Sequence, residues 1–307
     1  MSRRYLIRRL LLVVPVLLGT ILLVYALVFL LPGDPIRRLA GSKPLAESTY
    51  NEIRERYHLD EPFLVQYTEY LKALAHGDLG ATFTGRDVSE IIKQRFPVTL
   101  NLAMGSFAVE VVLGLALAVV AAVKRRTFLD SGILVITLLL ITVPVIVLGF
   151  LLQYTLGLKL GWFPVAGIRE GWRSYVLPSL TLGLGSAAAL GRLARSNLLD
   201  NMAGEHIRAT VARGLRPQRV MRHVLKNSLV PIVTILGLDL AYLMGGAVIT
   251  ETIFNLPGLG YQLVVGIRTE NGPLVVGLVT VSAIIFIFMN LIVDLFCARI
   301  DPRISYE

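Results

Sequence analysis

The sequence predicts an all-helical membrane protein with six transmembrane helices, a cytoplasmic amphipathic helix and a small helical segment outside the membrane. The first observation is composition: of 307 residues, 55% are hydrophobic and 17% charged, and the mean hydropathy is +0.69. Such a composition lies outside the range of soluble domains. The second is a series of apolar runs close to the roughly 20 residues needed to cross a bilayer. The third is a set of Lys and Arg clusters between alternate runs, which orients membrane helices.

The first apolar run covers residues 10–31. Four basic residues precede it: Arg3, Arg4, Arg8 and Arg9. They place the N-terminus in the cytoplasm, because positively charged flanks stay on that side. No small-residue cleavage site follows the run, so we expect residues 1–31 to form a permanent anchor and not a signal peptide.

Residues 32–97 are polar and are expected to form a helical segment outside the membrane. Two stretches, 45–57 and 62–75, have helical apolar spacing. Pro62 suits the first turn of the second helix, because its missing N–H has no partner there in any case. The charges are mixed, and a long loop reports orientation weakly.

The second and third runs cover residues 98–123 and 132–158, and the cluster Lys124-Arg125-Arg126 between them marks a cytoplasmic end. The third run is expected to be one helix that accommodates Pro144, as membrane helices can. The connection that follows contains the only two tryptophans, Trp162 and Trp172, which are typical of a membrane interface.

The fourth run, residues 175–191, has small residues at four-residue spacing, which predicts a closely packed buried helix. The pairs are Gly183 with Ala187 and Gly185 with Ala189. The fifth and sixth runs cover residues 229–249 and 274–297, and residues 298–307 form a cytoplasmic tail. We take 98–297 as the core domain. With both termini inside, cytoplasmic segments hold 17 Lys and Arg, against 4 in the two short external connections.

A polar island interrupts this apolar half at residues 200–228. Ala203, Ile207, Val211 and Leu215 recur every four residues, which predicts a short amphipathic helix. Gly214 suits its C-terminus, and Pro217 cannot continue the same helix, so we expect a turn there and a second basic helix from Gln218 to Asn227. The alternative is a basic loop lying on anionic lipid headgroups.

No motif for catalysis is present. The chain lacks a P-loop, H-E-x-x-H and G-x-S-x-G, and its four histidines are scattered. The one cysteine, Cys297, excludes an intrachain disulfide. We therefore predict no catalytic residue, no metal site, no cofactor and no nucleic-acid partner, and a protein that takes its energy from a partner or an ion gradient.

Glu110 and Asp239 are the acidic residues near the middle of predicted spans. A carboxylate at the bilayer centre costs about 2.5 to 3.5 kcal/mol on insertion scales, so it tends to face a cavity or a partner. Both are candidates to line a solute path. The alternative is equally open: each acid could be protonated or hydrogen-bonded inside an interface between helices.

The chain resembles the permease subunits of ATP-binding-cassette importers for dipeptides, oligopeptides and nickel, in particular the first of their two permease types. The resemblance extends from end to end. Its motifs, in order, are Leu31-Pro-Gly-Asp-Pro35, Leu59-Asp-Glu-Pro62, Gln66-Tyr67, Gly77-Asp-Leu-Gly80, Pro97-Val-Thr-Leu100, the polar island, Glu251-Thr-Ile-Phe254, Leu256-Pro-Gly-Leu-Gly260 and Asp301-Pro-Arg303.

The resemblance implies a permease of the bacterial plasma membrane, surrounded by lipid. Its implied partners are a second permease, two ATPase subunits that use ATP and Mg²⁺, and an extracytoplasmic solute-binding protein. The island would be the coupling segment that docks on an ATPase. The implied contact residues are Glu205, His206, Ile207, Arg208, Ala209, Thr210, Ala212, Arg213, Gly214 and Leu215.

One motif departs from the wider importer pattern. Where Glu-Ala-Ala-x-x-x-Gly is usual, this chain has Arg208-Ala209-Thr210 before Gly214, and Glu205 is our candidate for the missing acidic contact. Two other functions remain open: a gradient-driven secondary transporter that uses Glu110 and Asp239, and a scaffold subunit without a path.

Overall fold

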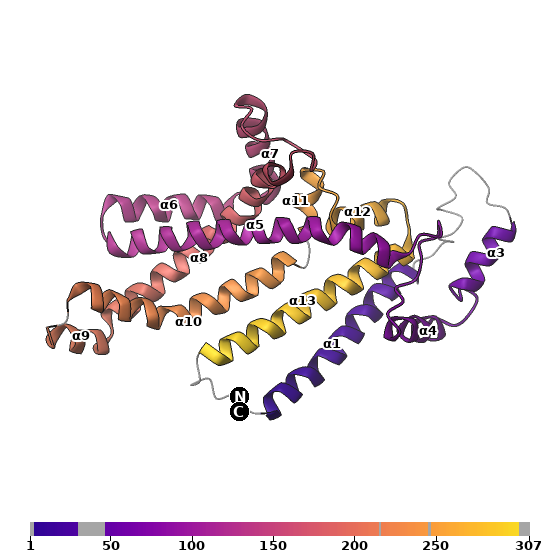
Figure 1. Cartoon of the computed structure of the whole chain (residues 1–307), viewed down its shortest axis with the longest axis horizontal. Coiled ribbons are helices and arrows are strands. Elements are labelled where there is room, and N and C mark those ends of the chain that lie inside the picture. Colours follow the sequence, from indigo (N-terminus) through magenta and orange to yellow (C-terminus); the bar gives the residue numbers. More distant parts are fainter. Residues whose placement is uncertain (1–2, 30–46, 215, 245–246, 301–307) are drawn as a thin grey trace.

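The structure is a computed structural model that describes residues 3–29, 47–214, 216–244 and 247–300. In these ranges the chain is helical, and the only β-pairing is an isolated bridge between Ala81 and Asp87. Long helices lie side by side along the molecule (Figure 1). They are α1 (Arg3–Phe29), α5 (Val88–Val123), α8 (Val176–Ala203), α10 (Pro217–Met244) and α13 (Gly272–Ile300).

Shorter helices join or flank these five. They are α3 (Glu47–Arg56), α4 (Phe63–Ala75), α6 (Phe128–Thr142), α7 (Val145–Leu152), η1 (Gln153–Lys159), η2 (Gly171–Tyr175), α9 (Glu205–Ala212), α11 (Val248–Ile253) and α12 (Leu259–Arg268). By length and composition, four described helices could cross a membrane, or up to six if each of two bent pairs is one span. The predicted all-helical class is confirmed.

The third predicted span is not one helix, contrary to our expectation. The chain bends by 104° between α6 and the helix that starts at Val145, and α7 projects from the rest of the bundle (Figure 1). Val143 is extended, with φ −70° and ψ 124°. The ring of Pro144 disfavours a helical conformation at the preceding residue and removes one N–H from the helix ladder, which accounts for the break.

The polar island is less separate than predicted. Helix α8 extends into the first residues of the island and ends at Ala203. The next residue, Gly204, is extended, with ψ 147°. The expected second basic helix and the fifth span form one helix, α10, which bends by 43° near Pro231. It begins at Pro217, which suits a first helical position, and ends at Met244 and not at residue 249.

Helices α5 and α8 make the most extensive contact in the bundle. Gly183 permits it, because a Cβ there would lie 2.6 Å from Ser106 O and 2.8 Å from Val109 Cβ. Ala187 is buried on the same face. The second predicted pair makes no close contact with the described residues: none of them lies within 4 Å of a Cβ at Gly185, and Ala189 is exposed.

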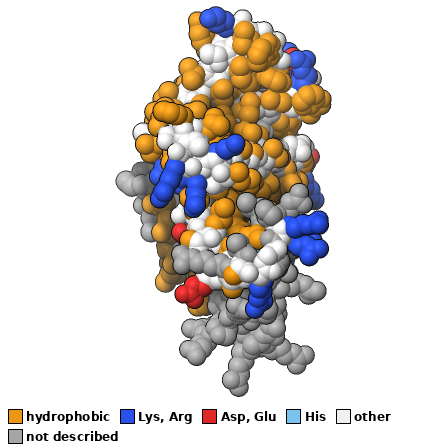
Figure 2. All heavy atoms as spheres, turned by 90° about the vertical axis from the view of Figure 1, so that its left-hand side faces the viewer, with side chains coloured by type: hydrophobic (Ala, Val, Ile, Leu, Met, Phe, Trp, Pro, Cys, Tyr) orange, Lys and Arg blue, Asp and Glu red, His pale blue; other side chains and the backbone are white. Residues whose placement is uncertain are grey.

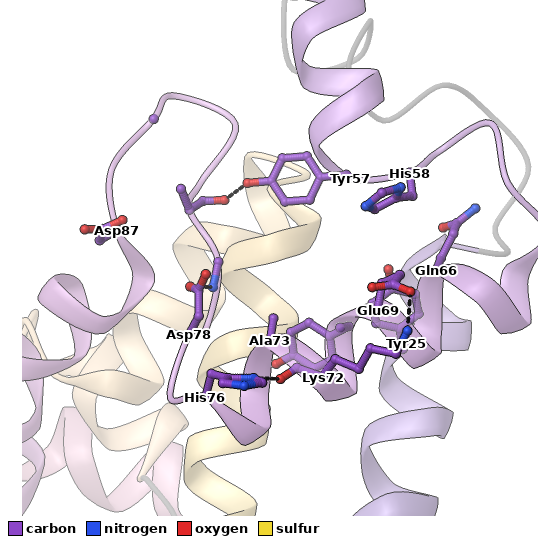
Figure 3. A pocket seen from close by; sticks show the side chains of 14 residues that line it. Tyr25, Tyr57, His58, Gln66, Glu69, Lys72, Ala73, His76, Asp78 and Asp87 are labelled. Carbon is purple, nitrogen blue, oxygen red and sulfur yellow. Dashed lines mark hydrogen bonds and ion pairs between the residues drawn. The ribbon is translucent and has the colours of Figure 1, made fainter.

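The outer segment contains the two predicted helices as α3 and α4. Tyr67 of α4 donates a hydrogen bond to Leu18 O of α1, at 2.9 Å. Tyr57 donates to Ala81 O and packs edge-on against Phe83. A cavity of about 700 Å³ lies between these elements, with Lys72 and Glu69 paired at 2.7 Å on its wall (Figure 3). The motifs at 31–35 and 301–303 lie outside the described residues.

Candidate functional site

Helix α9 lies at one end of the molecule, remote from α3 and α4 (Figure 1). Ile207 anchors it: this side chain is 4% exposed and packs in a cluster with Leu198 of α8 and Val224 of α10. Ala203, which we placed on the same apolar stripe, belongs to α8 and is exposed. The side chains of Val211 and Leu215 lie outside the described part. Among the described side chains of α9, Ile207 is thus the one buried against the bundle.

Most of the described coupling candidates face outward. Thr210 is half-buried, the side chains of His206 and Arg208 are outside the description, and the exposed members are Glu205, Ala209, Ala212, Arg213 and Gly214. Gly214 has φ +76°, a conformation that favours glycine, as predicted. A short segment between two long helices therefore presents an open polar surface at this end.

The same end of the molecule is basic. Figure 2 looks onto it and shows Lys and Arg side chains spread over a mostly hydrophobic surface. Exposed residues of the α5–α6 turn and of the α9–α10 region include Lys124, Arg125, Arg126, Arg213 and Arg216. The α5–α6 turn, whose basic cluster we assigned to the cytoplasm from sequence, thus lies at the same end of the bundle as α9 (Figure 1).

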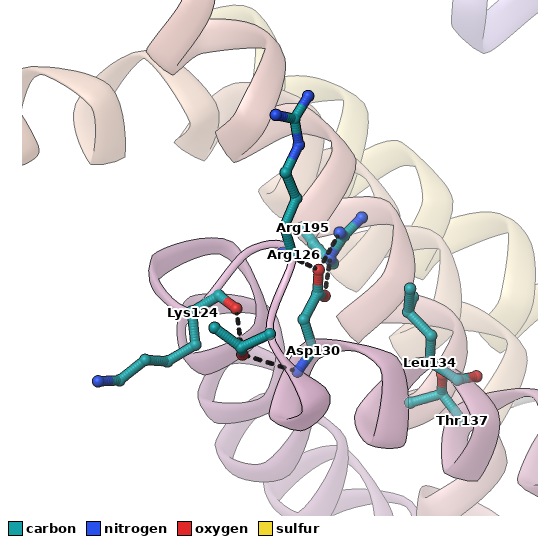
Figure 4. Close-up of polar contacts among 7 residues, drawn as sticks. Lys124, Arg126, Asp130, Leu134, Thr137 and Arg195 are labelled. Carbon is teal, nitrogen blue, oxygen red and sulfur yellow. Dashed lines mark hydrogen bonds and ion pairs between the residues drawn. The ribbon is translucent and has the colours of Figure 1, made fainter.

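An ion pair between a buried acid and a half-buried arginine joins this end of α6 to α8 (Figure 4). Arg195 donates from Nε to Asp130 Oδ1 at 2.7 Å and from Nη2 to Oδ2 at 2.8 Å. Asp130 also accepts the backbone N–H of Arg126 at 2.9 Å. Sequence reasoning missed Asp130. The signal was Thr127-x-x-Asp130 before an apolar run, a helix-start pattern in which Thr127 is the N-cap.

A second buried acid organises the contact of α11 and α12 with α5. Glu251 is fully buried, and its Oε1 accepts a hydrogen bond from Thr99 Oγ1 at 2.7 Å. Its Oε2 accepts the backbone N–H of Tyr261 at 2.8 Å, and Thr99 Oγ1 accepts that of Leu259 at 2.8 Å. Burial raises the pKa of Glu251, while these hydrogen bonds act in the opposite direction.

Two glycines make this contact possible. A Cβ at Gly258 would lie 2.5 Å from Glu251 Cδ, and one at Gly260 would lie 2.7 Å from Val248 Cα. The close approach explains why glycines alternate within Leu256-Pro-Gly-Leu-Gly260. We quoted this motif only for its resemblance. Its physical role is to bring the first turn of α12 onto a carboxylate, where helix N–H groups stabilise negative charge.

The structure brings the two mid-span acids together. Glu110 of α5 is fully buried, and no hydrogen-bond partner for its carboxylate oxygens is present among the described residues. Asp239 of α10, half-buried, is the acid that interacts with it. Their role in a solute path stays a prediction. In the described ranges, no group of three or more His, Cys, Asp or Glu side chains is placed to hold a metal ion.

The fold and this site define a class: a helical, multi-pass membrane protein with a small surface segment at its basic end. Comparison with known proteins gives the family. Residues 112–306 match the family described as "Binding-protein-dependent transport system inner membrane component". Residues 2–103 match "Binding-prot-dependent transport system membrane comp, N-term". The chain therefore belongs to this family of inner-membrane transport components.

Relatives that match nearly the full length of the chain support the same family assignment. The chain is 36% identical over 305 residues to "Glutathione transport system permease protein GsiC" of Salmonella choleraesuis (strain SC-B67), and over 306 residues to that of Escherichia coli (strain K12). Each match covers 99% of both chains. Two crystal forms of the inward-facing MetNI methionine ABC transporter share the fold, with TM-scores of 0.56 and 0.59. Their sequence identity to this chain is 18% and 19%. Each match covers 69% of this chain, and 97% and 96% of the two compared chains.

Proposed function

We propose that this chain forms half of the transmembrane path of an ATP-driven importer, together with a second, homologous permease. Two ATPase subunits bind ATP and Mg²⁺ on the cytoplasmic side, and a solute-binding protein delivers the solute outside. The observation that carries this proposal is α9. It is a short exposed segment, fixed to the bundle through Ile207 and lying between the two long helices α8 and α10. A partner that moves α9 would move both helices.

The proposed solute is a short peptide. Relatives that match nearly the whole chain are named for glutathione transport, and glutathione is itself a small peptide. The proposed orientation puts α9 and both termini in the cytoplasm, because the basic clusters after α5 and around α9 lie at one end of the molecule. In this arrangement α3 and α4 face the binding protein.

Reconstitution tests this function. We expect proteoliposomes that hold the complete importer to accumulate labelled glutathione only when ATP is hydrolysed. A non-hydrolysable ATP analogue should support no accumulation. Uptake that follows a proton gradient without ATP would instead establish a secondary transporter.

Glu110 and Asp239 supply a further arm of that experiment. Two facing acids inside a membrane cannot both hold a charge cheaply. If they line the path, Glu110→Gln and Asp239→Asn should each lower uptake while the complex still assembles. Parental uptake in both variants would show that they are packing residues.

A further inference from the structure

A second cavity lies where η2 joins α8, on the face that these elements share with α5. Its volume is about 660 Å³, within the range of about 300–1,000 Å³ that is typical of small-molecule sites. The lining comes from α5 (Asn101, Gly105), η2 (Trp172, Tyr175) and the first turn of α8 (Ser179), with apolar residues between them. None of its lining residues carries a charge.

Ser179 is the unusual member of this set. Its side chain is 5% exposed, and its Oγ has no hydrogen-bond partner among the described residues. Neighbouring buried hydroxyls are satisfied within their own helices: Thr181 donates to Leu177 O and Ser106 to Leu102 O, both at 2.8 Å. Buried polar groups are normally bonded, so an unbonded one at a cavity wall indicates that a ligand completes it.

Gly105 leaves room for the Ser179 hydroxyl. A Cβ at position 105 would lie 2.3 Å from Ser179 Oγ, so any larger residue would displace the hydroxyl or cover it. The absence of a side chain at Gly105 therefore lets the unbonded Ser179 hydroxyl keep its position at the cavity wall.

The lining groups define the ligand chemistry. Asn101 offers an amide oxygen and two N–H donors, and Ser179 offers one donor and an acceptor. Trp172 and Tyr175 contribute flat, largely apolar surfaces. Amide and hydroxyl groups match the C=O and N–H of a peptide bond, while the lack of charge gives no preference for acidic or basic side chains.

We propose that this cavity is the contact of this chain with its solute, and that it binds the uncharged backbone of a short peptide through Asn101 and Ser179. The proposal rests on the proposed function. It places the recognised group in the peptide bond and leaves the charged ends of the solute to other subunits. The cavity excludes Glu110, although the adjacent Val109 lines it.

Uptake kinetics in proteoliposomes holding the complete importer test this site. The probes are labelled glutathione, which is acidic, and trialanine, which has uncharged side chains. Asn101→Leu and Ser179→Ala should each raise KM for both probes by about fivefold, as expected for a lost hydrogen bond between uncharged groups. The maximal rate should change less. Ser179→Ala removes only an unbonded hydroxyl, so folding should not suffer.

Two tryptophans provide the matched control. Trp172 and Trp162 are both exposed and lie in the same connection, but only Trp172 lines the cavity. Trp172→Ala should raise KM, and Trp162→Ala should not. Unchanged KM in Asn101→Leu, Ser179→Ala and Trp172→Ala would overturn the site while the proposed function stands. A change confined to glutathione would also overturn it, because recognition would then depend on charge. If the wild-type importer moved neither peptide with ATP, the proposed function would fail as well.

Discussion

Arg195 and Asp130 are joined by two parallel hydrogen bonds, with Nε and Nη2 of the arginine donating to the two carboxylate oxygens at 2.7 and 2.8 Å. The pair ties the first turn of α6 to α8, two turns before α8 ends at Ala203. The helix that leads into α9 is therefore fixed to the α5–α6 turn at the basic end of the bundle.

The first prediction concerns the geometry of this pair. Arg195→Lys keeps the charge but cannot reproduce the planar two-bond contact. We expect fewer solute molecules imported per ATP hydrolysed, with the complex still assembled. Arg192→Lys, an exposed position on the same helix, is the control and should keep the parental ratio. A parental ratio in Arg195→Lys would mean that charge alone is sufficient.

The second prediction concerns Thr99. Thr99→Val keeps the shape of the side chain but leaves the N–H of Leu259 unbonded and removes one donor from Glu251. We expect the free energy of unfolding to fall by about 1–3 kcal/mol, the usual effect of unsatisfied buried polar groups. Denaturant titration in detergent measures this. Thr142→Val, whose hydroxyl bonds to Leu138 O on an exposed surface, should change stability far less, and equal effects would contradict the account.

The third prediction separates the two glycines of α8. Gly183→Ala places a methyl group against Ser106 O and Val109, and overpacking of this kind costs about 1–3 kcal/mol. Gly185→Ala meets nothing within 4 Å and should be neutral or slightly stabilising, because alanine favours helix. Thermal unfolding of the two variants in detergent compares them. A neutral Gly183→Ala would show that α5 and α8 are not in close contact.

The fourth prediction concerns orientation. We expect that, in a Cys297→Ser background, an impermeant thiol reagent applied to intact cells will label a cysteine at Ser48 but not at Thr127 or Ser196. All three positions are exposed in the structure. Thr127 and Ser196 lie near the basic end, and Ser48 belongs to the outer segment. Labelling of Thr127 or Ser196 from outside would reverse the topology.

Much of the fold is readable from local pattern. The spacing of apolar residues gave α3, α4 and α9, and the positive φ of Gly214 follows from its place after a helix. The break at Pro144 was missed, because a proline inside a membrane helix causes anything from a slight kink to a sharp bend, and the neighbouring helices decide between them.

The buried acids show where sequence reasoning ends. Asp130 and Arg195 are 65 positions apart, and Thr99 and Glu251 are 152 apart. No local period encodes such pairs, which form only when helices pack. The uncharged cavity around Ser179 was missed for the same reason, since its lining comes from three separate elements.

Gly214 gives the most direct test of the central claim, that α9 couples ATP hydrolysis in partner subunits to movement of this bundle. Nothing in the described chain lies within 4 Å of a Cβ at this position, so a Cβ added by Gly214→Val meets no described residue. It does disfavour the φ of +76°, and it adds bulk to the exposed surface, whereas Gly214→Asn fits this backbone conformation better.

The measurement is co-purification of the ATPase subunits together with ATP-driven uptake. We expect Gly214→Val to reach normal levels in the membrane but to lose ATPase association or to lower uptake per ATP by about tenfold, equivalent to about 1.4 kcal/mol of coupling. Gly214→Asn should retain more of both, and Arg216→Ala should change little. Normal ATPase binding and normal uptake in Gly214→Val would contradict the coupling role of α9.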